Sequence, residues 1–425
     1  MSKETPSQKT NSLTATVLCS NNEKLTVRDQ NNLIYTITPE NNSYTVGDKL
    51  IIEYTGLLDE NINILNIKPV SQDEEDIAIR TTDSMFSKFK SLADQKIKEM
   101  TLEEKIGQIL LVRYPDTNIK SVINEYKVGG FIFFEKDFKD KTTKDVQDMM
   151  KNIQSISKIP LLTAVDEEGG DVIRISSNKN LIESEFLSPR DLYLEGGFDL
   201  ISEDTKRKST LLEKLGINLN LAPVVDVSTN STDYIYNRTL GEGVELTKTY
   251  AKTVIEASKD NDSVSYVLKH FPGYGNNEDT HTGIVTDKRT LESLKENDLP
   301  PFESGINSGA EAILVNHNIV ESLDQNNPAS LSAKVHNLLR DDLKFTGIII
   351  TDDLSMNAIS QIDNAPVKAL LAGNDIIITT NYEESFNSIK DAVESNTISE
   401  ELINEIAHKI ISWKYSKGLM YEKIK

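Results

Sequence analysis

Hydrophobic residues between positions 13 and 70 come in short runs, and clusters of Asn, Asp and Gly separate these runs. Two of the separating clusters are Asn21-Asn22 and Gly47-Asp48. Short β-type runs between turn residues predict strands that are joined by tight connections. We therefore expect a small all-β domain over residues 13–70, a five-stranded barrel or sandwich, with strands at 14–18, 24–27, 33–37, 49–54 and 62–67.

The pattern changes at residue 84, where helical periodicity begins to alternate with short apolar runs. Strands that alternate with helices predict a parallel sheet. Eight such units over about 340 residues fit a (β/α)8 barrel. A doubly wound open sheet is the alternative, but no Gly-rich phosphate-binding motif follows an early strand. The predicted barrel strands are 109–112, 131–134, 161–165, 219–222, 264–268, 312–315, 348–350 and 376–378.

Polar stretches flank the predicted β domain. Residues 71–83 are acidic and predict a linker, and residues 1–12 predict a flexible tether. Such a tether often follows the lipidated cysteine of an exported lipoprotein, so we expect an exported or envelope-associated protein, with a cytoplasmic location as the alternative. No stretch reaches the ~20 apolar residues of a membrane span. We expect residues 84–425 to form the domain that contains the functional site.

Composition narrows the class of function. The chain has 425 residues, 38% of them hydrophobic and 27% charged, which is typical of a soluble globular protein. Its net charge of -21 argues against a polyanion-binding surface, so nucleic acid is not an expected partner. The single cysteine, Cys19, excludes an internal disulfide and a thiolate metal cage, and we interpret it as a strand residue.

Charged and imidazole side chains follow five of the predicted barrel strands. In a (β/α)8 barrel the chemistry collects at the carboxyl ends of the strands. Because both charge signs occur there, we expect a site for a polyhydroxylated and mostly neutral substrate. The residues are Asp166 after the third strand, Asp226 and Arg238 after the fourth, Lys269 and His270 after the fifth, Asn316 and His317 after the sixth, and Asp352 and Asp353 after the seventh.

The densest cluster runs from Lys269 to His281 and contains two of the five histidines. Lys269 and His270 are adjacent, so both can reach one pocket only at a strand end or a bulge. Asp279 and His281 stand two residues apart. A carboxylate beside an imidazole orients it and raises its pKa, which suits a general acid/base, whereas an isolated Asp-x-His would be an ordinary surface loop.

Asp352 stands where a buried strand opens to the pocket, so it can act as a nucleophile or an electrostatic stabiliser. The alternative is that it caps a helix over residues 354–359, but Asp353 fits that cap better. His317 is expected in a supporting position at the site. Neither a cofactor nor a metal is predicted. Zinc held by Asp279, His281 and His270 is the weaker alternative, because the neighbouring lysine would repel a cation.

Several motifs occur in a family's order, and through them residues 100–421 resemble glycoside hydrolase family 3, in its β-N-acetylglucosaminidase branch. They include Val165-Asp166-Glu167-Glu168-Gly169-Gly170, Leu221-Ala222-Pro223-Val224-Val225-Asp226-Val227, Lys269-His270-Phe271-Pro272-Gly273, Pro328-Ala329-Ser330-Leu331-Ser332 and Ala372-Gly373-Asn374-Asp375.

The resemblance implies a role for each site residue. Asp352 would be the nucleophile that forms a covalent glycosyl-enzyme, and His281, paired with Asp279, would be the acid/base. The implied activity is that of a retaining exo-β-N-acetylglucosaminidase on cell-wall muropeptides or chitin-type oligosaccharides. The β domain lies outside the resemblance, and a spacer and contact with the cell wall are its two candidate roles. The implied sugar-binding residues are Asp166, Arg174, Arg238, Lys269 and His270.

The chain departs from the family pattern at three places. Tyr274 replaces the usual histidine, Asp171 replaces the usual arginine, and the interval from Gly275 to His281 is one residue shorter than is common. These departures concern the reach of the loop and the preference for a leaving group. Two other functions stay open: a phosphorylase of the same branch, because a histidine acid/base tolerates an incoming phosphate, and a non-catalytic carbohydrate-binding protein.

Overall fold

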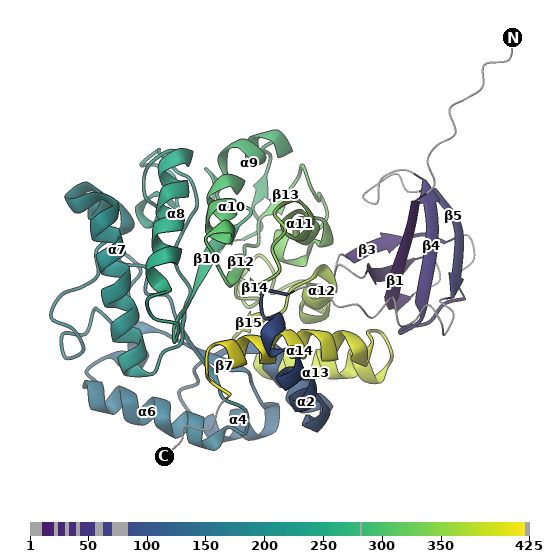
Figure 1. Ribbon diagram of the computed structural model, residues 1–425, viewed down its shortest axis with the longest axis horizontal. Helices are drawn as coiled ribbons and strands as arrows, with labels where there is room; N and C mark the ends of the chain where they lie inside the picture. Colours follow the sequence, from purple (N-terminus) through teal and green to yellow (C-terminus); the bar gives the residue numbers. More distant parts are fainter. Residues whose placement is uncertain are drawn as a thin grey trace, which may run out of the picture.

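The computed structural model describes residues 11–20, 24–29, 34–39, 43–55, 63–69, 84–280 and 283–420. Figure 1 shows two parts, a small β-sheet near the N-terminus and a larger unit of strands and helices. The predicted linker 71–83, most of the tether 1–12, and His281 lie outside the described residues.

The N-terminal part is an antiparallel sheet in the order β3-β2-β1-β4-β5, and the five predicted strands are confirmed. Alternate residues of β1 (Leu13, Ala15 and Val17) are buried, together with Leu50 and Ile52 of β4. A period of two places these side chains on one face of the sheet, which explains the alternating sequence. The strands are β1 (Asn11–Ser20), β2 (Leu25–Asp29), β3 (Ile34–Ile37), β4 (Lys49–Thr55) and β5 (Asn63–Pro69).

The larger part is a (β/α)8 barrel, as predicted. Its eight strands pair in parallel in the order β14-β12-β10-β9-β8-β7-β6-β15. A parallel bridge between Ile350 and Ile376 joins the two ends of this order. The strands are β6 (Leu110–Arg113), β7 (Gly130–Phe133), β8 (Leu162–Val165), β9 (Leu219–Asn220), β10 (Ser265–Phe271), β12 (Ala312–Val315), β14 (Ile348–Thr351) and β15 (Ile377–Thr379). The short strands β11 (Thr286–Asp287) and β13 (Ile319–Val320) pair outside the barrel.

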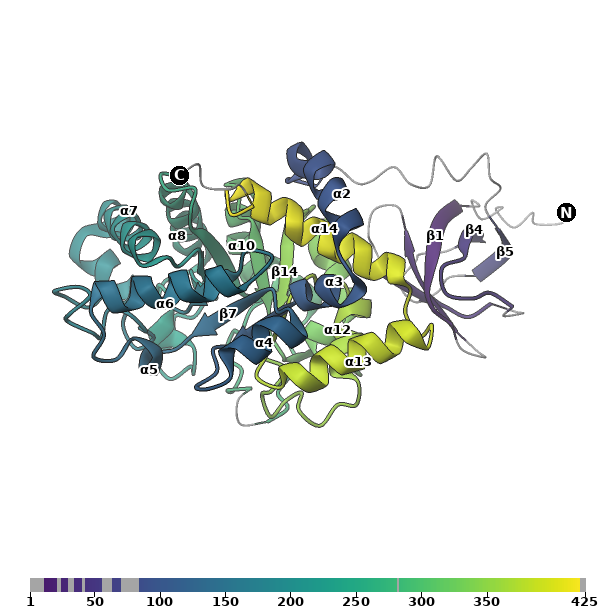
Figure 2. The same ribbon diagram turned by 90° about the horizontal axis from the view of Figure 1, so that it is seen from below.

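Helices cover the outside of the barrel strands (Figures 1 and 2). Local signals set their ends: Thr101 and Glu104 form a capping box that starts α3. In the part of the chain that the structure describes, no helix has the length and apolar character to cross a membrane. The helices are α2 (Lys90–Glu99), α3 (Leu102–Ile109), α4 (Ile119–Tyr126), α5 (Glu135–Phe138), α6 (Thr143–Ile156), α7 (Pro189–Leu215), α8 (Val244–Ser258), α9 (Leu291–Asn297), α10 (Leu299–Asn307), α11 (Ala333–Asn337), α12 (Ala365–Ala372), α13 (Tyr382–Glu394) and α14 (Glu400–Ser416).

The N-terminal sheet is held against the barrel's outer helices (Figure 2). Ile34 of β3 exchanges two hydrogen bonds with the Asn337 side chain, at 3.2 and 3.0 Å. The guanidinium of Arg28 donates to Glu405 of α14 at 2.6 Å. Leu18 and Ile34 belong to the same apolar cluster as the barrel core. Apolar packing and polar contacts therefore both fix the sheet in place.

Candidate active site

The carboxyl ends of the barrel strands bring the predicted residues together. Asp166 follows β8 and Asp352 follows β14, while Lys269 and His270 lie within β10, which continues beyond its predicted end at Leu268. The pairing of β10 with β12 changes register between Leu268 and Phe271, and the Lys269–His270 peptide bond is cis. Both side chains contact the same polar network.

Lys269 is buried between two carboxylates. Its Nζ lies 2.7 Å from Oδ1 of Asp166 and 2.6 Å from Oε1 of Glu168. Glu168 also accepts two hydrogen bonds from the Arg238 guanidinium, at 3.0 and 2.8 Å. Burial alone would raise the pKa of Glu168, but Arg238 and Lys269 outweigh burial and hold it well below its ordinary value. Glu168 was not among the predicted site residues, because nothing in the sequence distinguishes it from its neighbour Glu167.

Glu168→Gln should destabilise the fold because it leaves two buried cations without their shared counter-charge. We expect the free energy of unfolding to fall by about 3–5 kcal/mol in urea denaturation. Glu183→Gln, which removes an exposed carboxylate from a nearby loop, is the control and should change the stability by less than about 0.5 kcal/mol. Equal denaturation midpoints for the two variants would contradict the central role of Glu168.

His270 joins this network to Asp226. Its Nδ1 lies 2.8 Å from Oδ2 of Asp226, and its Nε2 lies 3.1 Å from Nη2 of Arg238. Because an arginine only donates, Nε2 of His270 must accept, and the proton lies on Nδ1 and is donated to Asp226. The backbone N–H of His270 also donates to Asp226, at 3.1 Å. This carboxylate therefore fixes the ring in one orientation and one tautomer.

Asp352 stands at the end of β14 with its carboxylate close to the same groups. Its Oδ1 accepts a hydrogen bond from the N–H of Asp353 at 2.9 Å. Burial alone would raise the pKa of Asp352. The nearby His317, together with the N–H of Asp353 and with Lys269, outweighs burial, and these groups hold the pKa below that of an ordinary aspartate. The side chain is therefore an ionised carboxylate near neutral pH.

His317 is fully buried behind this carboxylate. Its Nε2 lies 3.0 Å from the carbonyl oxygen of Asp353, and its Nδ1 lies 2.7 Å from Oγ of Ser330. Because a carbonyl only accepts, the proton of this contact lies on Nε2. The predicted helix over 354–359 is wrong: these residues form turns. Oδ1 of Asp353 instead accepts the N–H of Ser355 at 2.8 Å, since the short polar side chain competes for a local backbone donor.

Arg174 lies in the loop after β8, and Glu167 organises this loop. The Glu167 carboxylate accepts the N–H groups of Arg174 and Ile175, each at 2.7 Å, and the Ser176 hydroxyl at 2.5 Å. The Arg174 guanidinium lies over the ring of Phe134, 5.6 Å from its centroid. Carboxylate acceptors and cationic donors, among them Asp166, Lys269 and Arg238, thus lie together at this end of the barrel, which suits the hydroxyl groups of a sugar.

The loop after β10 carries Asp279, which is partly buried. The Tyr234 hydroxyl lies close to Asp279 and to Arg238, whose charges act on it in opposite directions. His281 and Thr282 lie outside the described residues, so the place of the predicted acid/base stays a prediction. Tyr234 was not among the predicted site residues, because no charge or motif distinguishes it in the sequence.

An ion-pair cluster closes the base of this loop. The Arg289 guanidinium binds Asp287 at 2.6 Å and Asp298 at 2.7 Å, and it donates to the carbonyl oxygen of Gly273 at 3.1 Å. Gly273 has a φ of +129°, and a Cβ there would lie 2.5 Å from Oδ1 of Asp298. Only glycine allows the loop to leave β10 so close to this carboxylate.

Asp298 should make the stability depend on pH. Burial raises its pKa to about 6, and Arg289 offsets this only in part. The folded-state pKa lies above the unfolded one, so this contribution is fully present below about pH 4 and is lost as the pH rises through 6. Between about pH 4 and pH 7, wild type should lose about 2–3 kcal/mol of unfolding free energy relative to Asp298→Asn. Urea denaturation at both pH values measures this, Asp363→Asn serves as an exposed control, and a constant difference would contradict it.

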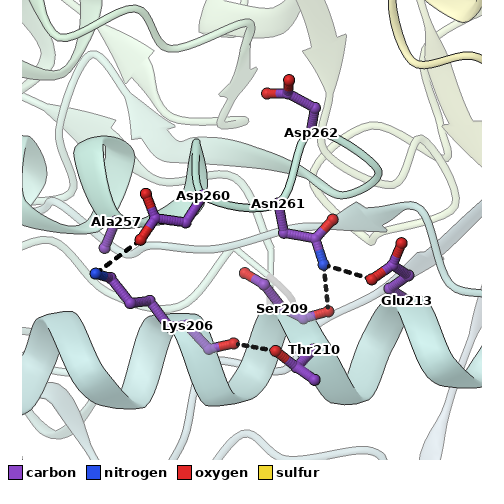
Figure 3. A pocket seen from close by; sticks show the side chains of 8 residues that line it. All are labelled: Lys206, Ser209, Thr210, Glu213, Ala257, Asp260, Asn261 and Asp262. Atoms are coloured by element: carbon purple, nitrogen blue, oxygen red, sulfur yellow. Dashed lines mark hydrogen bonds and ion pairs between the residues drawn. The ribbon is translucent and has the colours of Figure 1, made fainter.

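A separate hollow of about 360 Å³ lies between α7 and α8 (Figure 3). It opens near Asn261 and Asp262, which lead into the amino end of β10, so it is away from the strand ends described above. Lys206 pairs with Asp260 across it at 2.7 Å, and Glu213 accepts a hydrogen bond from Asn261 at 2.8 Å. Among the described residues, no group of three or more His, Cys, Asp and Glu side chains is arranged to hold a metal ion.

Comparison with known proteins gives consistent matches. Residues 101–413 match the glycosyl hydrolase family 3 N-terminal domain. β-Hexosaminidase LpqI of Mycobacterium tuberculosis is 32% identical over 293 residues, which cover 66% of this chain and 74% of LpqI. A β-hexosaminidase of Xylella fastidiosa is 29% identical over 297 residues, which cover 67% of this chain and 86% of the relative.

A solved structure agrees with these matches. The family 3 β-N-acetylglucosaminidase from a Paenibacillus species superimposes with a TM-score of 0.71 and 29% identity. The match covers 77% of this chain and 64% of the Paenibacillus chain. The family match over residues 101–413 spans most of the chain and includes all eight barrel strands. The protein therefore belongs to glycosyl hydrolase family 3 and is a glycoside hydrolase that acts on O-glycosyl bonds.

Proposed function

We propose that this enzyme is a retaining exo-β-N-acetylglucosaminidase with Asp352 as its nucleophile. The observation that carries the proposal is an ionised carboxylate at the end of β14, close to the His270 and Lys269 side chains of the polar network. Asp166, Arg174, Arg238, Lys269 and His270 would bind the hydroxyl groups of the terminal sugar. The names of the relatives, β-hexosaminidase and β-N-acetylglucosaminidase, support the choice of sugar.

The first step would form a covalent glycosyl-enzyme. An oxygen of Asp352 attacks the anomeric carbon while the bond to the glycosidic oxygen breaks. His281, protonated and stabilised by Asp279, gives its proton to the departing oxygen. The leaving alcohol is neutral, and the positive charge that develops on the sugar ring lies beside the Asp352 carboxylate.

The second step would release the sugar. Water attacks the anomeric carbon, His281 accepts a proton from that water, and the bond to Asp352 breaks. The anomeric configuration is inverted twice and so retained. The buried ion pairs of Lys269 and Arg238 hold the binding groups in place through both steps, so little reorganisation is needed when charge develops.

The natural substrates would be cell-wall muropeptides or chitin-type oligosaccharides. The relatives named as β-hexosaminidases support this class. The N-terminal sheet would be a candidate for contact with the polymer, because it is fixed to the barrel and its strand β5 exposes Leu65. Release of N-acetylglucosamine from purified muropeptides and from chitin oligosaccharides would distinguish the two substrates.

The proposed function is tested with 4-nitrophenyl glycosides in buffers with and without phosphate, with identification of the sugar product. Free N-acetylglucosamine in both buffers, and much slower release from the β-glucoside, supports the hydrolase. A sugar 1-phosphate formed at a phosphate-dependent rate would instead support a phosphorylase. No turnover of either glycoside, together with measurable binding of N-acetylglucosamine, would support a carbohydrate-binding protein.

A further inference from the structure

A second set of contacts, separate from the Arg289 cluster, holds the loop after β10. The Tyr274 hydroxyl lies 2.6 Å from Oγ1 of Thr280, and it also accepts the backbone N–H of Thr280 at 3.3 Å. Tyr274 is 2% exposed and Thr280 is fully buried. Two hydrogen bonds shielded from water therefore hold the residue that directly follows Asp279.

Tyr274 is itself fixed to the sugar-binding network. Its backbone N–H donates to Oδ1 of Asp226 at 2.6 Å, and the other oxygen of this carboxylate binds His270. The Tyr274 ring packs edge-on against the His270 ring at 5.4 Å and lies 5.8 Å from the Tyr234 ring. One carboxylate thus ties together a sugar-binding ring and the tyrosine that holds the loop.

Packing and hydrogen bonding can be separated at this position. The Tyr274 ring belongs to a small apolar cluster with Val224 and Ile235. A phenylalanine would keep the ring in that cluster and would lose only the hydroxyl. The change would leave Thr280 with a buried hydroxyl and a buried N–H that have lost this partner, so the loop would move in order to hydrate them.

We propose that Tyr274 is a positioning residue that sets the place of Asp279 by holding Thr280. The Tyr234 ring is tilted against that of Tyr274, and its hydroxyl lies close to Asp279, so both tyrosines border this carboxylate. The proposal deepens the function proposed above and rests on it. A displacement of about 1 Å in a catalytic group can lower a rate by roughly a hundredfold, so a single hydroxyl at this place has a large effect.

Tyr274→Phe in the full chain tests the proposal, with Tyr266→Phe as the matched control. Tyr266 is also buried, and its hydroxyl lies 3.0 Å from Oγ of Ser209, away from the loop. Two quantities are measured: hydrogen exchange of the loop amides 276–280 without substrate, and kcat and KM on a β-linked N-acetylglucosamine disaccharide. We expect Tyr274→Phe to speed the exchange and to lower kcat by roughly ten- to a hundredfold with little change in KM.

The control, Tyr266→Phe, should leave kcat and KM unchanged and should not speed the exchange of the loop amides. Thr280→Val removes the other partner, and the double variant should be no worse than either single variant, because both changes break the same contact. Unchanged loop exchange in Tyr274→Phe, or faster exchange with unchanged kcat, would overturn the proposal. If wild type fails to cleave any hexosaminide, the proposed function fails, and the exchange of substrate-free protein still decides whether Tyr274 holds the loop.

Discussion

Asp352→Ala should lower kcat on β-N-acetylglucosaminides by roughly 10⁴-fold or more while leaving the fold intact. The side chain is the ionised carboxylate at the end of β14, and without it no group on that face of the sugar can form the covalent intermediate. Hydrolysis of the 4-nitrophenyl substrate measures the loss. Added azide should restore release of nitrophenol, because the small anion can enter the vacated space and form the glycosyl azide of inverted configuration.

Asp353→Asn is the matched control for this change. The neighbouring side chain accepts the N–H of Ser355, which an amide oxygen can also do, so the rate should stay within about tenfold of wild type. Near-normal turnover in Asp352→Ala would refute its assignment as the nucleophile. A glycosyl azide of retained configuration would refute the double-displacement course.

His281→Ala should slow natural disaccharides by about 10²–10⁴-fold and aryl glycosides far less. A sugar alkoxide is a poor leaving group and needs a proton in the transition state, whereas a nitrophenolate leaves without one. A plot of log kcat/KM against the leaving-group pKa should therefore be steeper for the variant than for wild type, and Asp279→Asn should show the same trend more weakly.

His408→Ala is the control, because His408 lies in α14 with its Nε2 3.0 Å from Asp94, outside the network described above. Its rates should match those of wild type on every leaving group. Equal losses on disaccharides and aryl glycosides in His281→Ala would show that the imidazole does not donate the proton. In that case the loop would serve binding rather than acid catalysis.

The strand-end residues could be predicted because the geometry of a (β/α)8 barrel decides which residues lie together. Once eight apolar runs alternate with helices, the residues after the runs must converge at one end. Asp166, Lys269, His270 and Asp352 follow from that rule. The helix over residues 354–359 could not be judged in the same way, because a local hydrogen bond from Ser355 to Asp353 competed with the helical pattern.

The contacts among these residues could not be predicted. Glu168 is the shared partner of Lys269 and Arg238, and these cations stand 101 and 70 positions away from it in the chain. Asp226 binds His270 and Tyr274, which belong to another strand and its loop. A single sequence does not show which distant carboxylate forms an ion pair with a buried cation.

The sequence by itself determined the periodicity, the eight-stranded barrel, the N-terminal strands and the chemical types of side chain at the strand ends. These features depend on local backbone preference and on the burial of apolar faces, and both are written along the chain. The tertiary structure decided the pairing: which carboxylate neutralises Lys269, which tautomer His270 adopts, and how Tyr274 and Arg289 hold the loop. Those outcomes depend on distances between elements and on burial, which change the strength of each electrostatic contact and exist only after the barrel has closed.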